Sequence, residues 1–125
     1  MEQQILEFKT PWPLMNVEDV AGELIVSFHP ESFLWPAVEE IGIALDKLLE
    51  ELEDCRFILD FANVDYLSGM GLEKLIHLHS QLKTKGQRLA LKNVSPVLLK
   101  LFHAAGMQKE FILNPVTRFV PSYSI

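Results

Sequence analysis

Apolar and polar residues alternate with two different periods along the chain from position 23 onward. Short runs rich in β-branched and aromatic residues have the length and composition of strands. Between these runs, apolar residues recur at steps of three and four, which predicts amphipathic helices. The predicted strands are Glu23–His29, Phe57–Phe61, Arg88–Val94 and Phe111–Leu113, and the predicted helices are 36–52, 68–85 and 97–105.

Proline, serine and glycine mark the ends of these predicted helices. Pro36 suits a first helical turn, and Ser95 followed by Pro96 gives an N-cap with proline at the first helical position. Gly86 and Gly106 are natural C-terminal stops. The helix boundaries are therefore indicated independently of the apolar pattern.

The two ends of the chain are harder to assign. Ile5–Phe8 fits an edge strand, but Pro11 and Pro13 interrupt the segment after it. Asp19–Gly22 fits a turn that leads into the first clear strand, and residues 115–125 form an irregular tail.

The alternation β-α-β-α-β-α-β predicts an α/β fold with a mostly parallel or mixed sheet of about four to five strands and about three to four helices. No repeat, linker or low-complexity tract divides the sequence, so residues 1–125 are predicted to form a single domain. Sites in such sheets lie beyond the C-terminal ends of the strands. Here that edge collects the loops Pro30–Trp35 and Asn63–Met70.

Composition narrows the classes of partner. The chain is 49% hydrophobic and has a net charge of −6, which argues against nucleic acid and against direct binding to an anionic membrane. Cys55 is the only cysteine, and no apolar run has the length of a signal peptide or membrane span. We therefore expect a cytoplasmic location, with any membrane role arising through a partner.

The sequence offers few candidates for catalysis or cofactor binding. Gly69–Gly71 lacks the third glycine of a dinucleotide loop, and two exposed helical N–H groups there fit an anion or simply a tight strand-to-helix turn. His77 and His79 are two apart on a helix, so they point in nearly opposite directions and cannot share a metal. Ser68 has no base beside it in the sequence. We expect neither a metal nor a cofactor.

Asp60 and Asp65 flank the end of one predicted strand. A pair of carboxylates is able to perform acid–base chemistry when its two environments differ. The alternative is that both side chains hold the loop by accepting hydrogen bonds from backbone donors. No catalytic set stands out, so an enzyme is not expected.

Apolar residues in the two loops are more informative. Phe33, Leu34, Trp35 and Met70 would crowd one edge of the predicted sheet. Methionine and aromatic residues are enriched at recognition surfaces. The alternative, equally open, is that Phe33 and Trp35 fold back and cover the end of the sheet.

The stretch Phe57–Leu113 resembles the STAS (sulfate transporter and anti-sigma-factor antagonist) family, in its anti-sigma-factor antagonist type. The likeness rests on several ungapped spacings, whereas the first fifty or so residues fit in outline only. The matching features are a strand ending in Asp60, the turn Asn63–Asp65, Gly71-Leu72 at a helix start, Gly86 at its end, Asn93–Pro96, and the Ala105–Met107 step.

The resemblance implies a protein-binding regulatory module with an anti-sigma factor or related histidine-kinase-like protein as partner. In that family the turn before the second helix usually reads Asp-Ser-Ser-Gly-Leu, and the second serine is phosphorylated. The corresponding positions here are Ser68, Gly69, Met70, Gly71 and Leu72. The acceptor position is therefore Met70, so the switch is either lost or moved to Ser68.

Two functions are compatible with this resemblance. The first is regulation of transcription by partner switching, and the second is a cytoplasmic accessory subunit of an ABC-type membrane transporter. A homodimer is also compatible with the sequence. The residues expected to contact a partner are Phe33, Leu34, Trp35, Asp65, Met70, Glu73, Lys74 and His77.

Overall fold

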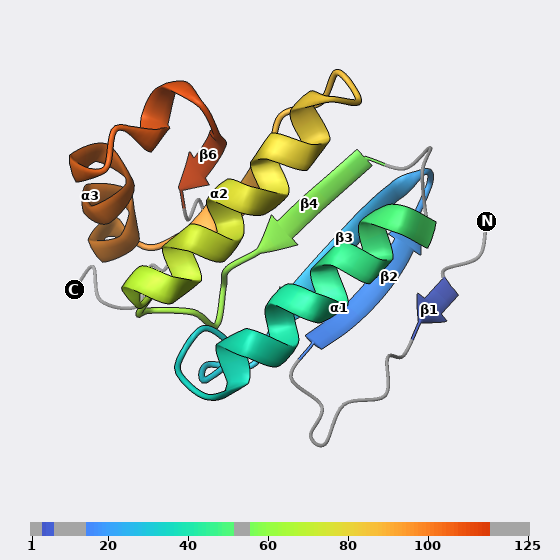
Figure 1. The fold of residues 1–125 in the computed structure, drawn as a ribbon, viewed down its shortest axis with the longest axis horizontal. Helices are drawn as coiled ribbons and strands as arrows, with labels where there is room; N and C mark the ends of the chain where they lie inside the picture. The colour runs from blue at the N-terminus through green and yellow to red at the C-terminus, as the bar shows by residue number, and fades with distance from the viewer. Residues whose placement is uncertain (1–3, 7–14, 52–55, 116–125) are drawn as a thin grey trace, which may run out of the picture.

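The computed structural model describes residues 4–6, 15–51 and 56–115. It contains three helices of eight or more residues, which are α1 (Ala37–Glu51), α2 (Gly69–Lys83) and α3 (Pro96–Ala104), and a short 3₁₀ turn at Met107–Lys109. Figure 1 shows them arranged around a single sheet. The strands are β1 (Gln4–Leu6), β2 (Met15–Val20), β3 (Glu23–Phe28), β4 (Arg56–Asp60), β5 (Ala90–Val94) and β6 (Ile112–Pro115).

The strands lie in the sheet in the same order as in the chain, from β1 to β6. The pairs β1–β2 and β2–β3 are antiparallel, whereas β3, β4, β5 and β6 are mutually parallel. This confirms the predicted α/β fold with a mixed sheet. The sheet has one strand more than the expected upper count, because β2 was not predicted.

The hairpin between β2 and β3 corrects the prediction for this part of the chain. Val20 pairs with Glu23, so the turn consists of Ala21 and Gly22 alone, with φ of 52° and 85°. Positive φ at both positions is the type I′ geometry that matches the twist of two-residue hairpins. Asp19 therefore belongs to β2 and not to a turn. The strand escaped notice because only Met15, Val17 and Val20 are apolar within it.

The predicted edge strand Ile5–Phe8 is represented by β1, which begins one residue earlier and ends at Leu6. Residues 7 and 8 lie outside the described residues, as does most of the predicted tail, from 116 to 125. The prediction of one domain over 1–125 stays a prediction.

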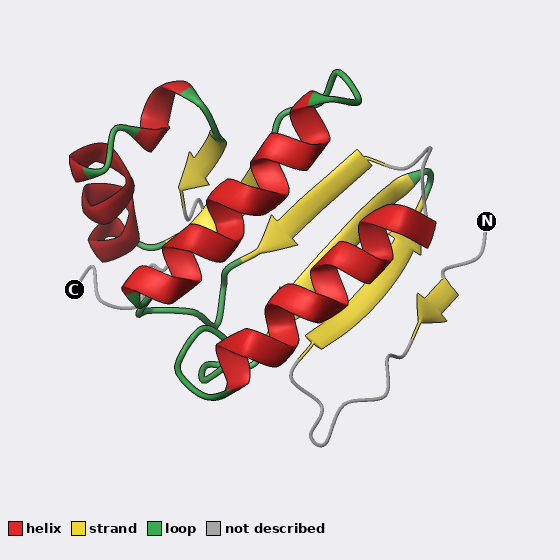
Figure 2. Cartoon of the chain, viewed as in Figure 1, coloured by secondary structure: helices red, strands yellow, loops and turns green. Residues whose placement is uncertain are grey.

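All three helices pack on one face of the sheet, as Figure 2 shows for α1 and α2. A single cluster of buried residues joins that face to the helices, and it includes Leu98 and Phe102 of α3. Right-handed crossovers between parallel strands that follow each other in the sheet place their helices on the same side. No helix of the described part of the chain is long and apolar enough to cross a bilayer.

The parallel strands end at one edge of the sheet, which we call the C-terminal edge. The loop after β3 runs to the start of α1, the loop after β4 runs to α2, and β5 passes directly into α3. Each of these helices thus begins at that edge (Figure 1). Every residue expected to contact a partner belongs to one of these loops or to the first nine residues of α2.

Candidate functional site

Phe33 lies inside the molecule and not on its surface. It is fully buried, and its ring centroid is 4.8 Å from that of Phe28 and 5.2 Å from that of Phe61. These rings close the C-terminal edge from within, so Phe33 folds back over the end of the sheet. It cannot contact a partner directly, because none of its surface is accessible.

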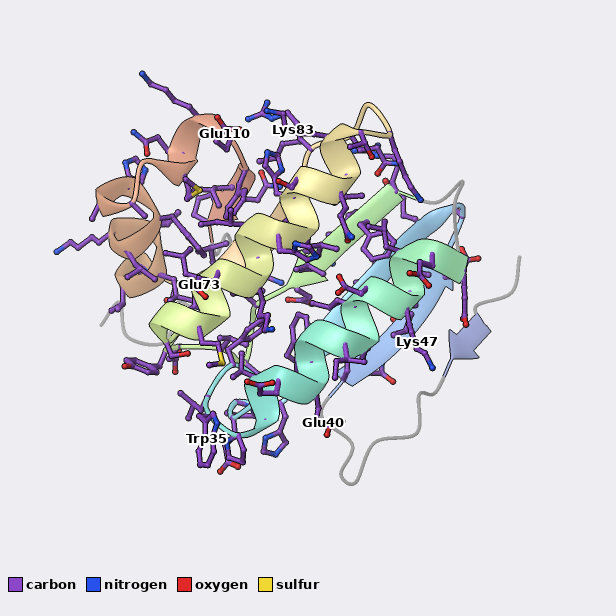
Figure 3. All side chains as sticks on the ribbon, viewed as in Figure 1. Trp35, Glu40, Lys47, Glu73, Lys83 and Glu110 are labelled. Atoms are coloured by element: carbon purple, nitrogen blue, oxygen red, sulfur yellow. The ribbon has the colours of Figure 1, made fainter. Side chains whose placement is uncertain are left out.

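Trp35, two residues after Phe33, lies on the surface. Its side chain is 74% exposed and projects from the loop into solvent, as Figure 3 shows. Leu34 between them is half-buried. Each alternative therefore holds for one of the two aromatic residues. Phe33 folds back into the core, and Trp35 stays on the surface, where a partner can contact it.

Ser68 ties the two loops together. Its Oγ donates a hydrogen bond to the carbonyl oxygen of Phe33 at 3.0 Å and accepts one from the backbone N–H of Gly71 at 3.1 Å. The second bond makes Ser68 the N-cap of α2. The single hydroxyl proton is thus directed at Phe33, and one acceptor position is used by the helix.

Gly71 allows the two loops to approach closely. A Cβ at this position would lie 2.9 Å from Leu67 Cδ1 and 3.3 Å from the Phe33 carbonyl oxygen. Both distances are shorter than ordinary van der Waals contacts. Glycine at the start of this helix therefore suits the close packing of the Phe33 loop against α2, and a larger residue would require Leu67 and the loop to shift.

Met70 occupies the first turn of α2 and is 37% exposed. Three other large apolar side chains are exposed where helices begin at the same edge, namely Trp35, Tyr66 at 62% and Val97 at 67%. We call Trp35, Tyr66, Met70 and Val97 the apolar edge residues. The sequence indicated Trp35 and Met70 only.

Tyr66 and Val97 were missed for separate reasons. Tyr66 lies in the predicted loop Asn63–Met70, of which only Met70 was counted as an apolar contact residue, and Val97 was placed in the predicted helix 97–105. A signal for Val97 was available, because Val97 directly follows the Ser95-Pro96 helix start. Its neighbour Leu98 is buried, so Val97 lies on the exposed side of the first turn of the helix.

Asp60, the last residue of β4, ties the start of the loop after β4 to strand β5. Its Oδ1 accepts hydrogen bonds from the backbone N–H of Ala62 at 3.0 Å and from Asn93 Nδ2 at 2.9 Å. Asn93 itself has a left-handed backbone with φ of 58°. Asp60 thus fixes loop geometry, whereas Asp65 is exposed.

Glu73, Lys74 and His77 continue from Met70 along one side of α2, at steps of three and four. They line a polar groove of about 280 Å³ between α2 and α1. His77 Nε2 lies 3.7 Å from Asp46 Oδ1 across this groove. The stem of Lys74 passes over Gly42, where a Cβ would lie 2.8 Å from Lys74 Cδ.

His79 is a structural residue on the other side of α2. Its Nδ1 accepts the backbone N–H of Leu89 at 3.1 Å, so the ring proton must lie on Nε2, which is 3.2 Å from Glu110 Oε1. Lys83 Nζ is 3.7 Å from the same oxygen (Figure 3). The hydrogen bond from His79, aided by Lys83, lowers the pKa of Glu110 below its usual 4.5.

Metal binding has no support within the described ranges. No three histidine, cysteine, aspartate or glutamate side chains gather there in a way that would hold an ion. The C-terminal edge instead combines exposed apolar side chains with loops held by Ser68 and Asp60. Such a rigid, partly apolar surface is suited to contacts with another macromolecule.

Comparison with known proteins identifies the family. A sequence model of the STAS domain matches residues 17–121, which is most of the chain. The chain belongs to the STAS domain family. This confirms the resemblance drawn from the sequence and extends it to β2 and β3.

A solved structure supports the same assignment at the level of the fold. This STAS domain superposes with a TM-score of 0.70 on a protein described as an anti-sigma-factor antagonist (STAS) domain protein from Planctomyces limnophilus. The two sequences are 18% identical, and the match covers 82% of this chain and 90% of the other. No curated protein sequence matches this STAS domain.

STAS domains are in general regulatory modules that act through contacts with other proteins, and they are not enzymes as a rule. Within this STAS domain, Met70 lies in the first turn of α2. The neighbouring hydroxyl of Ser68 serves as the helix cap.

Proposed function

We propose that this STAS domain is a protein-binding regulatory module that acts on an anti-sigma factor or a related histidine-kinase-like protein. The observation that carries the proposal is the exposure of Met70 among the apolar edge residues. Isolated exposed apolar residues are ordinary, but four large ones at the starts of three helices indicate a contact surface.

The proposed surface has an apolar part and a charged part. Trp35 and Met70 form the apolar part, and Asp65, Glu73 and His77 lie at its margin, exposed. Interfaces commonly have this composition, with aromatic and methionine side chains at the centre and charged side chains at the rim. Phe33 contributes indirectly, by supporting the loop that carries Trp35.

We further propose that the phosphorylation switch is lost in this protein and has not moved to Ser68. A thioether at position 70 cannot accept a phosphoryl group. The Ser68 hydroxyl proton is engaged with the Phe33 carbonyl, and the oxygen caps α2. Phosphorylation there would require both bonds to break and the two loops to separate. Binding would then depend on the amount of partner and not on a charge added to this surface.

Binding is tested with purified protein and histidine-kinase-like anti-sigma factors from the same genome, by isothermal titration calorimetry. We expect Trp35→Ala and Met70→Glu each to weaken binding by at least about tenfold, since truncating a central aromatic or placing a charge in an apolar contact has this size of effect. Ile43→Ala is the matched control, because Ile43 is 60% exposed but lies in the middle of α1.

Equal affinity of the Trp35→Ala, Met70→Glu and wild-type proteins for a bound partner would exclude this surface. The loss of the switch is tested separately, by incubation with the partner kinase and ATP followed by mass spectrometry. We expect no phosphate on the chain, and stoichiometric phosphate on Ser68 would contradict the proposal. Recovery of an ABC-type ATPase in place of an anti-sigma kinase in a pull-down would favour the transporter-subunit function.

A further inference from the structure

The second face of the sheet carries no helix within the described part of the chain. α1, α2 and α3 share one core cluster with the opposite face, and that cluster contains alternate residues of each central strand. Leu24 and Val26 of β3 belong to it, as do Phe57 and Leu59 of β4. The residues between them therefore point to the helix-free face.

An apolar row crosses this helix-free face. Ile25 pairs with Ile58, Ile58 pairs with Ala90, and Ala90 pairs with Ile112, so the four lie side by side on neighbouring strands. None of them belongs to the core cluster: Ile112 is exposed, Ile25 and Ile58 are half-buried, and Ala90 is buried between its larger neighbours. A row of this kind on a sheet face is an unusual feature of a surface that meets only water.

The side chains of the row differ in size, and charged residues lie along one side of it. Ala90 is the small member, and a hollow of about 370 Å³ beside it is lined by Arg56, Arg88 and Ile112 among others. Two residues further along the strands, Asp60 of β4 pairs with Lys92 of β5. The face thus presents the large, half-buried Ile58 next to the small Ala90 with its hollow, and a negative charge next to a positive one.

We propose that this face is the interface of a homodimer, with a two-fold axis parallel to the strands between β4 and β5. That operation brings β4 opposite β5 of the partner, and β3 opposite its β6. Ile58 then meets the partner's Ala90 and its hollow, and Ile25 meets the partner's Ile112. Asp60 meets the partner's Lys92.

The partner that best fits this face is a second copy of the same chain. In a two-fold interface each contact occurs twice, so one surface must carry both members of every pair. Here a large residue neighbours a small one, and an acid neighbours a base, at matching positions on the two central strands. A net charge of −6 on each chain disfavours association through repulsion between the two copies. The dimer must therefore be held by the apolar row and by local opposite-charge pairs such as Asp60 with Lys92.

A dimer formed through the helix-free face is independent of the proposed function. The apolar edge residues lie at the ends of the strands, so such a dimer leaves Trp35 and Met70 accessible. Failure of partner binding and failure of dimerisation are consequently separate results.

Sedimentation velocity over a concentration series tests the proposal with the full chain. We expect wild type to form a species of twice the 14.3 kDa chain mass. For Ile58→Glu we expect the dimer dissociation constant to rise at least about tenfold, because the substitution places a charge in the apolar row. Lys47→Glu is the control, since Lys47 is exposed on α1 on the opposite side of the molecule and the variant still dimerises. A monomer at every concentration, or an Ile58→Glu dimer as tight as wild type, would overturn the proposal.

A cross-linking experiment tests the arrangement and does not depend on a destabilising charge. In a Cys55→Ser background, Ile58→Cys and Ala90→Cys proteins are mixed and treated with a short bismaleimide cross-linker, because facing sheets lie about 10 Å apart and a direct disulfide requires Cα atoms within about 7 Å. We expect linked heterodimers to form faster than either linked homodimer, because residue 58 faces residue 90 of the other chain. Preferential linkage of Ile58→Cys to itself would contradict the proposed axis.

Discussion

Ser68 and Phe33 are 35 residues apart in the sequence, yet the Ser68 Oγ lies 3.0 Å from the Phe33 carbonyl oxygen. This one hydrogen bond joins the loop after β3 to the loop that precedes α2. The same hydroxyl caps α2 through the N–H of Gly71. The Ser68 side chain therefore helps to fix the position of Trp35 relative to Met70, together with the packing of Phe33 and the close approach at Gly71.

Ser68→Ala is expected to destabilise the fold by about 2 kcal/mol, since it removes an N-cap worth about 1 kcal/mol and a part-buried hydrogen bond of similar size. Urea unfolding measures the change. Ser95→Ala is the matched control, because Ser95 Oγ caps α3 through the N–H of Leu98 and makes no hydrogen bond to another loop among the described residues. A loss for Ser68→Ala no larger than that for Ser95→Ala would show that the tie to Phe33 contributes nothing.

Gly71→Ala is expected to destabilise the protein by about 1–3 kcal/mol, because the new methyl group would overlap Leu67 Cδ1 and crowd the Phe33 carbonyl. Gly69→Ala, two residues earlier in the same helix, has nothing within 4 Å of the added Cβ. It should be neutral or stabilising by up to about 1 kcal/mol, since alanine favours helix. Thermal or urea unfolding of the pair checks this, and similar effects of both changes would contradict the packing argument.

Asn93 has two roles that separate substitutions distinguish. Asn93→Ala removes the hydrogen bond to Asp60 and places alanine at φ of 58°, which together should cost about 2 kcal/mol. Asn93→Gly removes the same bond but adopts that backbone without strain, so it should cost about 1 kcal/mol less than the alanine variant. Equal unfolding free energies for the two variants would show that the left-handed backbone adds no strain.

Glu110 gives the protein a predictable response to acid. Its folded pKa is lowered by the hydrogen bond from His79 and by Lys83, so its ionised form is favoured by folding. This contribution is fully present above the unfolded pKa, near 4.5, and is lost as the pH falls through the lower folded pKa. Urea midpoints between pH 6 and pH 3 should fall less steeply for Glu110→Gln, which keeps an acceptor for His79. An NMR-measured pKa for Glu110 at or above 4.5 would contradict the assignment.

The sequence predicted those features that depend on neighbouring residues. The steps of three and four placed α1, α2 and α3 within a few residues of their observed bounds, and Ser95-Pro96 marked the start of α3. β2 was missed because its charged residues Glu18 and Asp19 hide a strand whose inward side chain, Val17, is fully buried. Pairing with β3 determines that strand, and pairing is not a local property.

The candidate site shows the same limit more sharply. Phe33 and Trp35 are both aromatic, two residues apart in one loop, and composition alone does not distinguish their environments. Their separation follows from the backbone of the loop and from the tie to Ser68 across the sheet edge. The loop-holding role of Asp60 was predictable, because its place at a strand end makes backbone donors available nearby.

The order of strands across the sheet also bears on how the chain reaches its native state. Each strand from β2 onward pairs with the strand that precedes it in the sequence. Closing each pair therefore requires only a hairpin or a single helical excursion, and the entropy lost in each closure is modest. The hairpin between β2 and β3 closes locally, whereas β3–β4, β4–β5 and β5–β6 are parallel pairs that close only through an intervening helix and form more slowly. We expect assembly to proceed by successive addition of neighbouring units along the sheet, with no strand threaded between two others.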